Sequence, residues 1–243
     1  MADWIGDDAL GYRRSRTDFS NGQPLRLDES YRLAHLPLIA PEHPDVIASR
    51  PGKPYEMGRH PAVTSLVLPI DAEALAASAN FRAMEAELRA APFADKIAWD
   101  LLPRRAALLH GTLCGSLGPL TEEQMQRLGS LPPFRVVLRG LFSGNVNLGR
   151  LYLRLYPQCR DGKNPIDAIQ AALGRPAGDL YLVGLYNLLD HLDANETAAL
   201  AALIERHWQT DLLEVVVDRL WLLTSRDDLV LDAGIERTLH LRG

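Results

Sequence analysis

The sequence predicts an α+β fold, and three observations lead to that prediction. Strand-like and helix-like segments follow one another without the regular alternation that a parallel α/β sheet requires. No glycine-rich phosphate loop follows a predicted strand, which disfavours a doubly wound nucleotide-binding sheet. The two halves of the ordered part are loosely alike, because each has a strand, a helix and a second strand that can face a shared cleft.

The N-terminal quarter is expected to form an irregular extension over residues 1–61. This part is rich in proline, glycine, aspartate and arginine, and its repeated prolines prevent a long helix. The ordered domain is therefore expected to cover residues 62–243. A chain of 243 residues fits one large domain or two small lobes that share a core.

The first half of the ordered domain predicts two strands and two helices. An apolar run over residues 63–69 predicts a strand, and apolar spacing over 72–91 predicts a helix that Asp71 caps. Residues 106–114 predict a second strand. Thr121 then opens a short helix, since Gln124 stands at the spacing of a capping box.

The second half predicts a hairpin, two helices, a buried strand and a closing hairpin. Pro165 at a first helical position and Gly174 after the last turn mark the bounds of one helix. The expected strands are residues 134–141, 147–156, 180–188, 213–224 and 228–241, and the other helix is 195–208.

The charge and composition disfavour several classes of partner. The net charge is −5 and no lysine- or arginine-rich run is present, so broad binding to duplex DNA is disfavoured, while a small basic pocket for one phosphate remains compatible. No apolar stretch approaches 18 residues, so we expect no membrane span. Cys114 and Cys159 are too few for a disulfide framework or a zinc site, and we expect reduced thiols in a cytoplasmic protein without metal or cofactor.

One short strand carries the residues best suited to chemistry. His110 and Thr112 are two positions apart, so their side chains share one face, with their Cα atoms about 7 Å apart. An imidazole beside a hydroxyl can hold a phosphate oxygen and move a proton. The alternative is a half-buried histidine that is hydrogen-bonded to a neighbouring strand.

With this motif in place, the order of elements over residues 62–241 resembles the 2H phosphoesterase superfamily, which includes 2′,3′-cyclic nucleotide phosphodiesterases and RNA 2′-5′ ligase-like proteins. The resemblance implies two pseudo-symmetric lobes that form a concave antiparallel sheet with outer helices. It also implies one His-x-Thr or His-x-Ser strand from each lobe, with the histidines as acid and base and the hydroxyls on phosphate.

His110 and Thr112 match the first motif of that family. The second motif falls on the strand after residue 180, where Tyr181 stands at the position of the second histidine and Val183 at that of its hydroxyl residue. A phenol can donate to a phosphate oxygen, so Tyr181 is a candidate substitute donor, the alternative being a sheet aromatic. Val183 offers no hydrogen bond. The resemblance therefore implies a divergent member.

Several arginines are candidates for contacts to substrate phosphate, because a guanidinium presents a fork of donors that suits phosphate oxygens. Arg104 and Arg105 precede the His110 strand, and Arg139 lies in a later strand. Arg150 and Arg154 share one face of the next strand. The usual alternative for each is a solvated surface position.

Three hypotheses on function follow. The first is a divergent phosphoesterase that acts on a cyclic phosphate or an RNA end, with His110, Thr112 and Tyr181 as its catalytic residues. The second is an inactive relative that binds a nucleotide or a phosphorylated metabolite. The third is an interaction protein whose cleft is filled by residues 1–61, and an open cleft lined by His110, Thr112 and arginines would argue against it.

Overall fold

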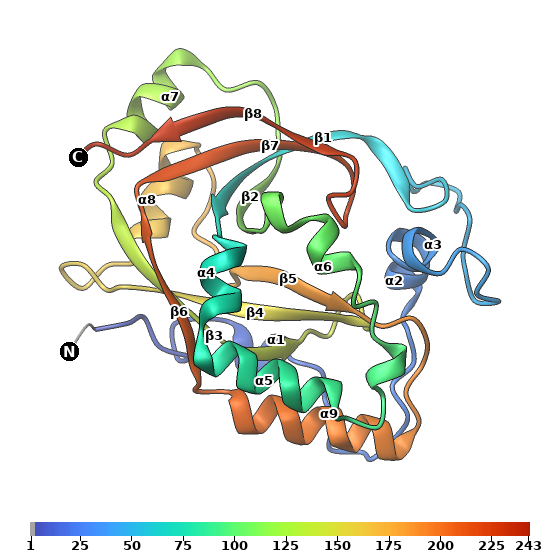
Figure 1. Ribbon diagram of the computed structural model, residues 1–243. Helices are drawn as coiled ribbons and strands as arrows, with labels where there is room; N and C mark the ends of the chain where they lie inside the picture. The colour runs from blue at the N-terminus through green and yellow to red at the C-terminus, as the bar shows by residue number, and fades with distance from the viewer. Residues whose placement is uncertain (1–2) are drawn as a thin grey trace.

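The computed structural model describes residues 3–243, in which one curled antiparallel sheet carries helices on its outside (Figure 1). This arrangement confirms the α+β class and the concave sheet with outer helices. The strands are β1 (Arg59–Pro69), β2 (His110–Leu117), β3 (Phe134–Ser143), β4 (Arg150–Pro157), β5 (Leu182–Asn187), β6 (Asp211–Val217), β7 (Arg219–Asp227) and β8 (Ala233–His240).

The eight strands lie in the order β6-β3-β4-β5-β2-β1-β7-β8. Four strands therefore stand on each side of the junction between β5 and β2. That junction is narrow, with Gly111 of β2 opposite Val183 of β5 as its single registered pair. A Cβ at Gly111 would overlap a terminal methyl group of Leu155, so glycine lets the Leu155 side chain pack at this crossing. The crossing sets the positions of the side chains that the two strands present to each other.

The sheet curls until β6 and β7, which are first and seventh in the strand order, come together. β6 pairs with β3 and β7 pairs with β1, yet Asp218 alone separates β6 from β7 in the chain. The sequence predicted one strand over residues 213–224, and the structure divides that segment between the two halves of the sheet. A sheet twists in one direction as strands are added, so it can return to its own start.

Three of the helices begin at polar residues that the sequence indicated. Asp71, Thr121 and Asn164 each accept a backbone hydrogen bond as N-cap of the helix that follows. The helices are α1 (Tyr12–Ser15), α2 (Glu29–Ala34), α3 (Leu36–Ile39), α4 (Ala72–Ala77), α5 (Ala79–Arg89), α6 (Leu101–Arg104), α7 (Glu122–Gly129), α8 (Pro165–Ala172) and α9 (Ala194–His207), with 3₁₀ turns η1 (Ala94–Lys96) and η2 (Ala106–Leu108).

The helix expected over residues 72–91 is two helices. Ser78 between them has an extended backbone (φ −64°, ψ 128°), and its hydroxyl accepts from the amide of Phe81 as the cap of α5. A serine favours such a cap over a helix interior, because its side chain competes for backbone hydrogen bonds. Within residues 3–243, no helix combines the length and the apolar character needed to cross a membrane.

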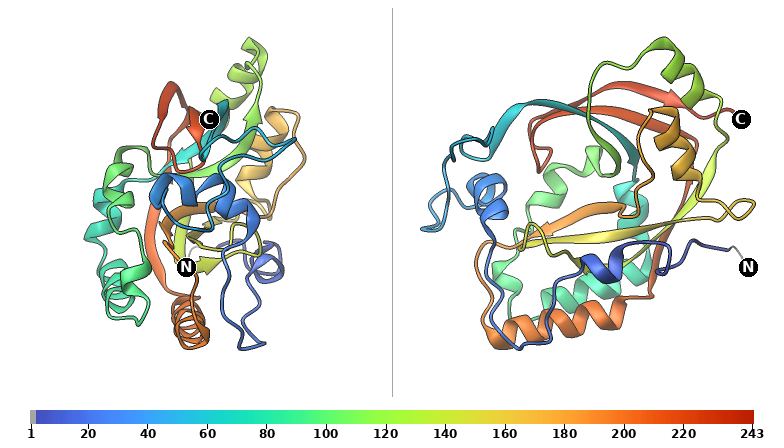
Figure 2. Two further views of the ribbon diagram at one scale, coloured as in Figure 1. Left: turned by 90° about the vertical axis from the view of Figure 1, so that its right-hand side faces the viewer. Right: turned by 180° about the vertical axis from the view of Figure 1, so that it is seen from behind.

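The N-terminal segment is packed into the same core as the sheet. The sequence predicted an irregular extension over residues 1–61, whereas residues 3–58 hold α1, α2 and α3, and β1 already begins at Arg59. Tyr12, Tyr31 and Leu36 have no exposed surface. The Tyr12 hydroxyl donates to the carbonyl of Leu155 at 2.5 Å, which ties α1 to β4. Figures 1 and 2 place α1 on the side of the molecule opposite α4 and α5.

Candidate functional site

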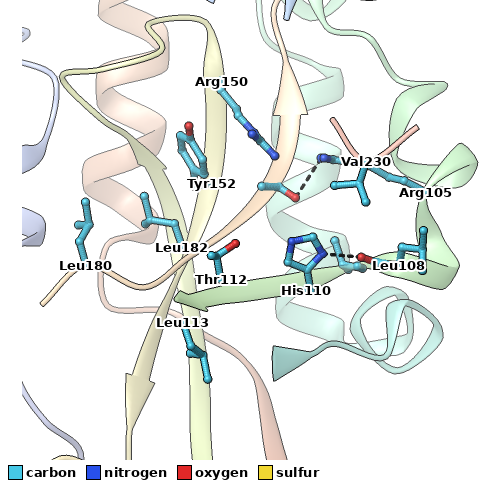
Figure 3. Close-up of a pocket in the computed structure, with 12 residues that line it drawn as sticks. Arg105, Leu108, His110, Thr112, Leu113, Arg150, Tyr152, Leu180, Leu182 and Val230 are labelled. Atoms are coloured by element: carbon cyan, nitrogen blue, oxygen red, sulfur yellow. Dashed lines mark hydrogen bonds between the residues drawn. The ribbon is translucent and has the colours of Figure 1, made fainter. Parts of the chain in front are cut away.

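A pocket of about 290 Å³ lies at the junction of the two halves of the sheet. The twelve residues drawn in Figure 3 come from the segment before β2, from β2 and β4, from β5 and the residue Leu180 just before it, and from the loop between β7 and β8. Residues 3–58 do not fill this pocket, because every described residue that lines it lies between positions 105 and 230. The lining residues are Arg105, Leu108, Leu109, His110, Thr112, Leu113, Arg150, Tyr152, Leu180, Leu182, Gly184 and Val230.

His110 begins β2 and turns its ring into the pocket (Figure 3). Its Nδ1 atom lies 2.7 Å from the carbonyl oxygen of Leu108. A carbonyl can only accept, so Nδ1 carries the proton in the neutral ring, and Nε2 holds the free lone pair. Among residues 3–243, Nε2 has no hydrogen-bond partner within the protein. The free lone pair is thus available to a bound molecule.

The surroundings of His110 keep its ring neutral. Burial, together with the positive charges of Arg150 and Arg105, lowers the pKa of His110 to about 4, against the opposing effect of the Leu108 hydrogen bond. At neutral pH the ring is therefore uncharged, and Nε2 can accept a hydrogen bond. A negative ion placed beside it would raise this pKa again, because an opposite charge favours the protonated ring.

Arg105 lies between α6 and η2 and is only 4% exposed. Its Nη2 atom donates to the carbonyls of Gly184 at 3.0 Å and Leu185 at 2.9 Å, which fixes the side chain against β5. Burial and the charge of Arg150 lower the pKa of Arg105 to about 9, so the guanidinium still carries its charge at neutral pH.

Arg150 begins β4 and reaches into the pocket from the other side of β5 (Figure 3). Its Nη1 atom donates to the carbonyl of Asp228 at 3.0 Å, and its guanidinium carbon lies 5.2 Å from the ring centre of Tyr152. A Cβ at Gly184 would overlap the Arg150 guanidinium. The missing side chain at position 184 is therefore what gives Arg150 its place.

The two arginines bring positive charge into the pocket without a carboxylate in direct contact, although the charge of buried Asp227 partly offsets the lowering of the pKa of Arg105 by burial. Among residues 3–243, no aspartate or glutamate forms an ion pair with Arg105 or Arg150, and the Nε atom of each is buried without a hydrogen-bond partner. The nearby carboxylate of Asp227 accepts instead from the amides of Leu229, Leu231 and Asp232. Buried charge is costly unless it is paired, so this arrangement favours a bound anion.

The loop between β7 and β8 covers the arginine side of the pocket. Its Asp228 carbonyl accepts from Arg150, and its Val230 side chain lines the cavity. Val230 has a φ of 64°, which a β-branched residue rarely adopts. The amides that Asp227 binds on both sides of Val230 hold this strained turn in place, and strain of this kind gathers at functional sites.

Thr112 lies between the polar and the apolar walls of the pocket and is exposed. The register of Gly111 with Val183 places Thr112 across from Leu182 and His110 across from Gly184. A twofold rotation about this crossing relates His110 to Leu182 and Thr112 to Gly184. The second strand therefore presents leucine and glycine where the first presents histidine and threonine.

Tyr181 does not line the pocket that contains His110. Its hydroxyl donates to the carbonyl of Gly178 at 2.5 Å, its ring is 1% exposed, and it is absent from the pocket wall. Burial raises the pKa of Tyr181 to about 12. The sequence placed the second motif at positions 181 and 183, whereas the face that meets His110 carries positions 182 and 184, because successive strand residues point to opposite faces.

Two of the five arginines predicted to contact phosphate, Arg105 and Arg150, line the pocket. Arg104 is exposed and pairs with Asp100 at 3.5 Å. Arg139 pairs with Asp211 at 2.5 Å and lies over the ring of Tyr156. Figure 3, which draws the residues of the pocket, accordingly shows neither Arg104 nor Arg139.

The sequence did not separate Arg150 from Arg154 as candidates, and it gave no role to Tyr152, which also lines the pocket. Arg150 and Arg154 stand on one face of a strand in the sequence, which marked both as candidates without separating them. In the structure Arg154 is fully buried elsewhere, with its guanidinium 3.7 Å from the ring centre of Trp208. Only the position of each along β4, relative to β5, decides which arginine reaches the pocket.

Comparisons with known proteins add little to this geometry. No family model matches the chain, and a search of curated proteins finds no match. Among solved structures, the chain is similar to the crystal structure of TT0787 of Thermus thermophilus, with 15% identity and a TM-score of 0.39 over 74% of this chain and 98% of that one. Within residues 3–243, no group of three or more His, Cys, Asp or Glu side chains is placed to hold a metal ion.

Proposed function

We propose that this protein binds a phosphorylated small molecule, with the phosphate held in the His110 pocket. The observation that carries the proposal is the pair of guanidinium groups, Arg105 and Arg150, that face one cavity with no ion-pair partner in the part of the chain described. Guanidinium forks match phosphate oxygens, and such charge-assisted bonds are stronger than neutral ones. Thr112 adds a hydroxyl donor at the open side.

The negative charge of the whole chain agrees with a confined anion site rather than an extended one. A net charge of −5 disfavours a duplex nucleic acid, which needs many phosphate contacts at once. Cys114 and Cys159 are both free, which supports the cytoplasm as the compartment, since oxidising compartments favour disulfides. The proposed ligand is therefore a small phosphorylated molecule of the cytoplasm.

Calorimetric titration with inorganic phosphate tests the proposal. Wild type should bind, and Arg150→Gln should bind about 10- to 100-fold more weakly, because a charge-assisted hydrogen bond contributes roughly 1.5–3 kcal/mol. Arg104→Gln is the matched control, since Arg104 is exposed and outside the pocket. Binding that is absent in wild type, or equally weakened in both variants, would contradict the proposal.

A second candidate function is hydrolysis of a cyclic phosphodiester, which the free Nε2 of His110 favours. Nε2 would take a proton from water as the water oxygen bonds to phosphorus, and the bond from phosphorus to the 2′ or 3′ oxygen would break. The leaving oxygen must then take its proton from solvent water, because Leu182 and Gly184 supply no acid on the opposite strand. Loss of one acid or base group typically costs about 10²–10⁴ in rate, so this reaction would be slow.

Turnover of 2′,3′-cyclic nucleotides and of oligonucleotides with a cyclic phosphate end separates the two candidates. Hydrolysis that disappears in His110→Ala, with binding retained, would establish the catalytic function. Binding without turnover in wild type would leave the binding function alone. A preference for the oligonucleotides over the mononucleotides would point to an RNA end as the ligand.

A further inference from the structure

The walls of the pocket divide into a cationic side and an apolar side. Arg105, Arg150 and His110 gather on one side in Figure 3, and Leu180, Leu182 and Tyr152 stand on the other, with Thr112 between them. A site that enclosed a free phosphate would place donors around it. In this pocket the charged donors lie on one side only, and the other side offers two leucines and the ring of Tyr152 with its hydroxyl, so most of that side suits an apolar group.

The apolar side is open to solvent rather than closed into the core. Leu180 is 39% exposed, although it precedes β5 at the centre of the sheet. Leu182 is half-buried and stands directly across from Thr112. Exposed leucines beside a polar rim are a common feature of ligand sites, where the apolar surface is covered when the ligand binds.

Resting on the proposed function, we propose that the ligand is an amphipathic phosphate ester. Its phosphate contacts Arg105 and Arg150, and an apolar group about the size of one ring lies against Leu180 and Leu182. The cavity of about 290 Å³ is at the small end of the range for ligand pockets, which limits the organic part to a small group. The ester oxygen would lie near Thr112, at the boundary between the two sides.

The leucine side chains explain why the organic group is expected to be apolar. A polyol or a second phosphate on the Leu182 side would lose its hydrogen bonds to water and find no donor or acceptor from Leu180 or Leu182. An aromatic or alkyl group loses nothing there and removes the leucine surface from water. The two leucines would therefore determine specificity, while the arginines provide the common phosphate contact.

Three probes test this inference: inorganic phosphate, phenyl phosphate and glycerol 3-phosphate, each titrated by calorimetry. Wild type should bind phenyl phosphate about tenfold more tightly than inorganic phosphate, as expected for burial of part of a ring. Glycerol 3-phosphate should bind no more tightly than inorganic phosphate. Leu180→Ser should remove most of the preference for phenyl phosphate, measured as the ratio of its affinity to that of inorganic phosphate in the same variant.

The controls separate this inference from the proposed function. Leu182→Thr is a second variant with the same expected loss of preference, and Val216→Ser on β6 is a matched control because Val216 is 62% exposed and far from the pocket wall. Phosphate binding without a preference for phenyl phosphate, or a preference that survives both leucine substitutions, would overturn the amphipathic ligand alone. A wild type that binds none of the probes would overturn the proposed function as well.

Discussion

The guanidinium of Arg150 on β4 occupies the space that a side chain at Gly184 on β5 would fill. A side chain at position 184 would overlap the Arg150 guanidinium, so the arginine lies in the pocket only because the neighbouring strand carries glycine there. Arg105 is held by the backbone of the same residue, since its Nη2 atom donates to the Gly184 carbonyl at 3.0 Å. One residue without a side chain thus positions both cations of the pocket.

Gly184→Ala should weaken phosphate binding as strongly as Arg150→Gln does, about 10- to 100-fold. The added methyl group displaces the guanidinium and removes its contact with the anion. Gly234→Ala is the control, because position 234 on β8 has no atom near its would-be Cβ. Calorimetry with inorganic phosphate makes the measurement, and unchanged affinity in Gly184→Ala would show that Arg150 does not bind the phosphate.

His110 should make the protein less stable as the pH falls. Its native pKa of about 4 lies below the value of about 6.5 in the unfolded chain, so the unfolded state takes up the proton first. The contribution of His110 is complete above pH 6.5 and declines toward pH 4, reaching a loss of about 2 kcal/mol at pH 5. Urea unfolding at pH 7 and pH 5 should show a smaller loss in His110→Asn than in wild type. Equal losses would mean that His110 titrates normally in the native state.

Anion binding should be coupled to proton uptake by His110. A bound anion raises the pKa of the ring, so the affinity for sulfate, whose charge is constant in this range, should increase as the pH falls from 7 to 5. In His110→Asn the affinity should vary much less with pH. Titrations in two buffers of different ionisation enthalpy count the protons taken up. No uptake in wild type would place the anion away from His110.

Val230→Gly should be more stable than Val230→Ala. At most positions the alanine variant is the more stable one, because glycine loses more backbone entropy on folding. Both variants lose the valine side chain, but only glycine adopts a φ of 64° without strain. We expect a difference of roughly 0.5–1 kcal/mol, because strain of about 1–2 kcal/mol is partly offset by the greater entropy of unfolded glycine. Urea unfolding measures it, with the same pair at Val216, an exposed β6 position, as a control that should keep the usual order. If the alanine variant were the more stable one at both positions, the backbone at Val230 would not be strained.

Local signals in the sequence were enough to predict the starts of α4, α7 and α8 and most strands, but not the helices of the N-terminal segment. The caps at Asp71, Thr121 and Asn164 each bind a backbone amide two or three residues later, so the short sequence around each cap is enough to predict it. His110 and Thr112 were predicted for the same reason, since two residues on one strand keep their relation whatever surrounds them.

The second strand of the site could not be predicted in the same way. Residues 180–188 contain apolar residues in both alternating sets, so no pattern of polar and apolar positions tells which set faces His110. The register of Gly111 with Val183 decides this, and it depends on pairing between distant segments. The division of residues 213–224 between β6 and β7 is also decided by long-range pairing.

The single residue that separates β6 from β7 has a mechanical consequence. Asp218 links strands that pair with opposite halves of the sheet, so the halves are joined both at the β2–β5 crossing and at this link. The relative position of the halves is therefore set at two separate places, one covalent and one made by strand pairing. Because the pocket lies at the second of these, its width depends on a contact that holds the whole sheet together.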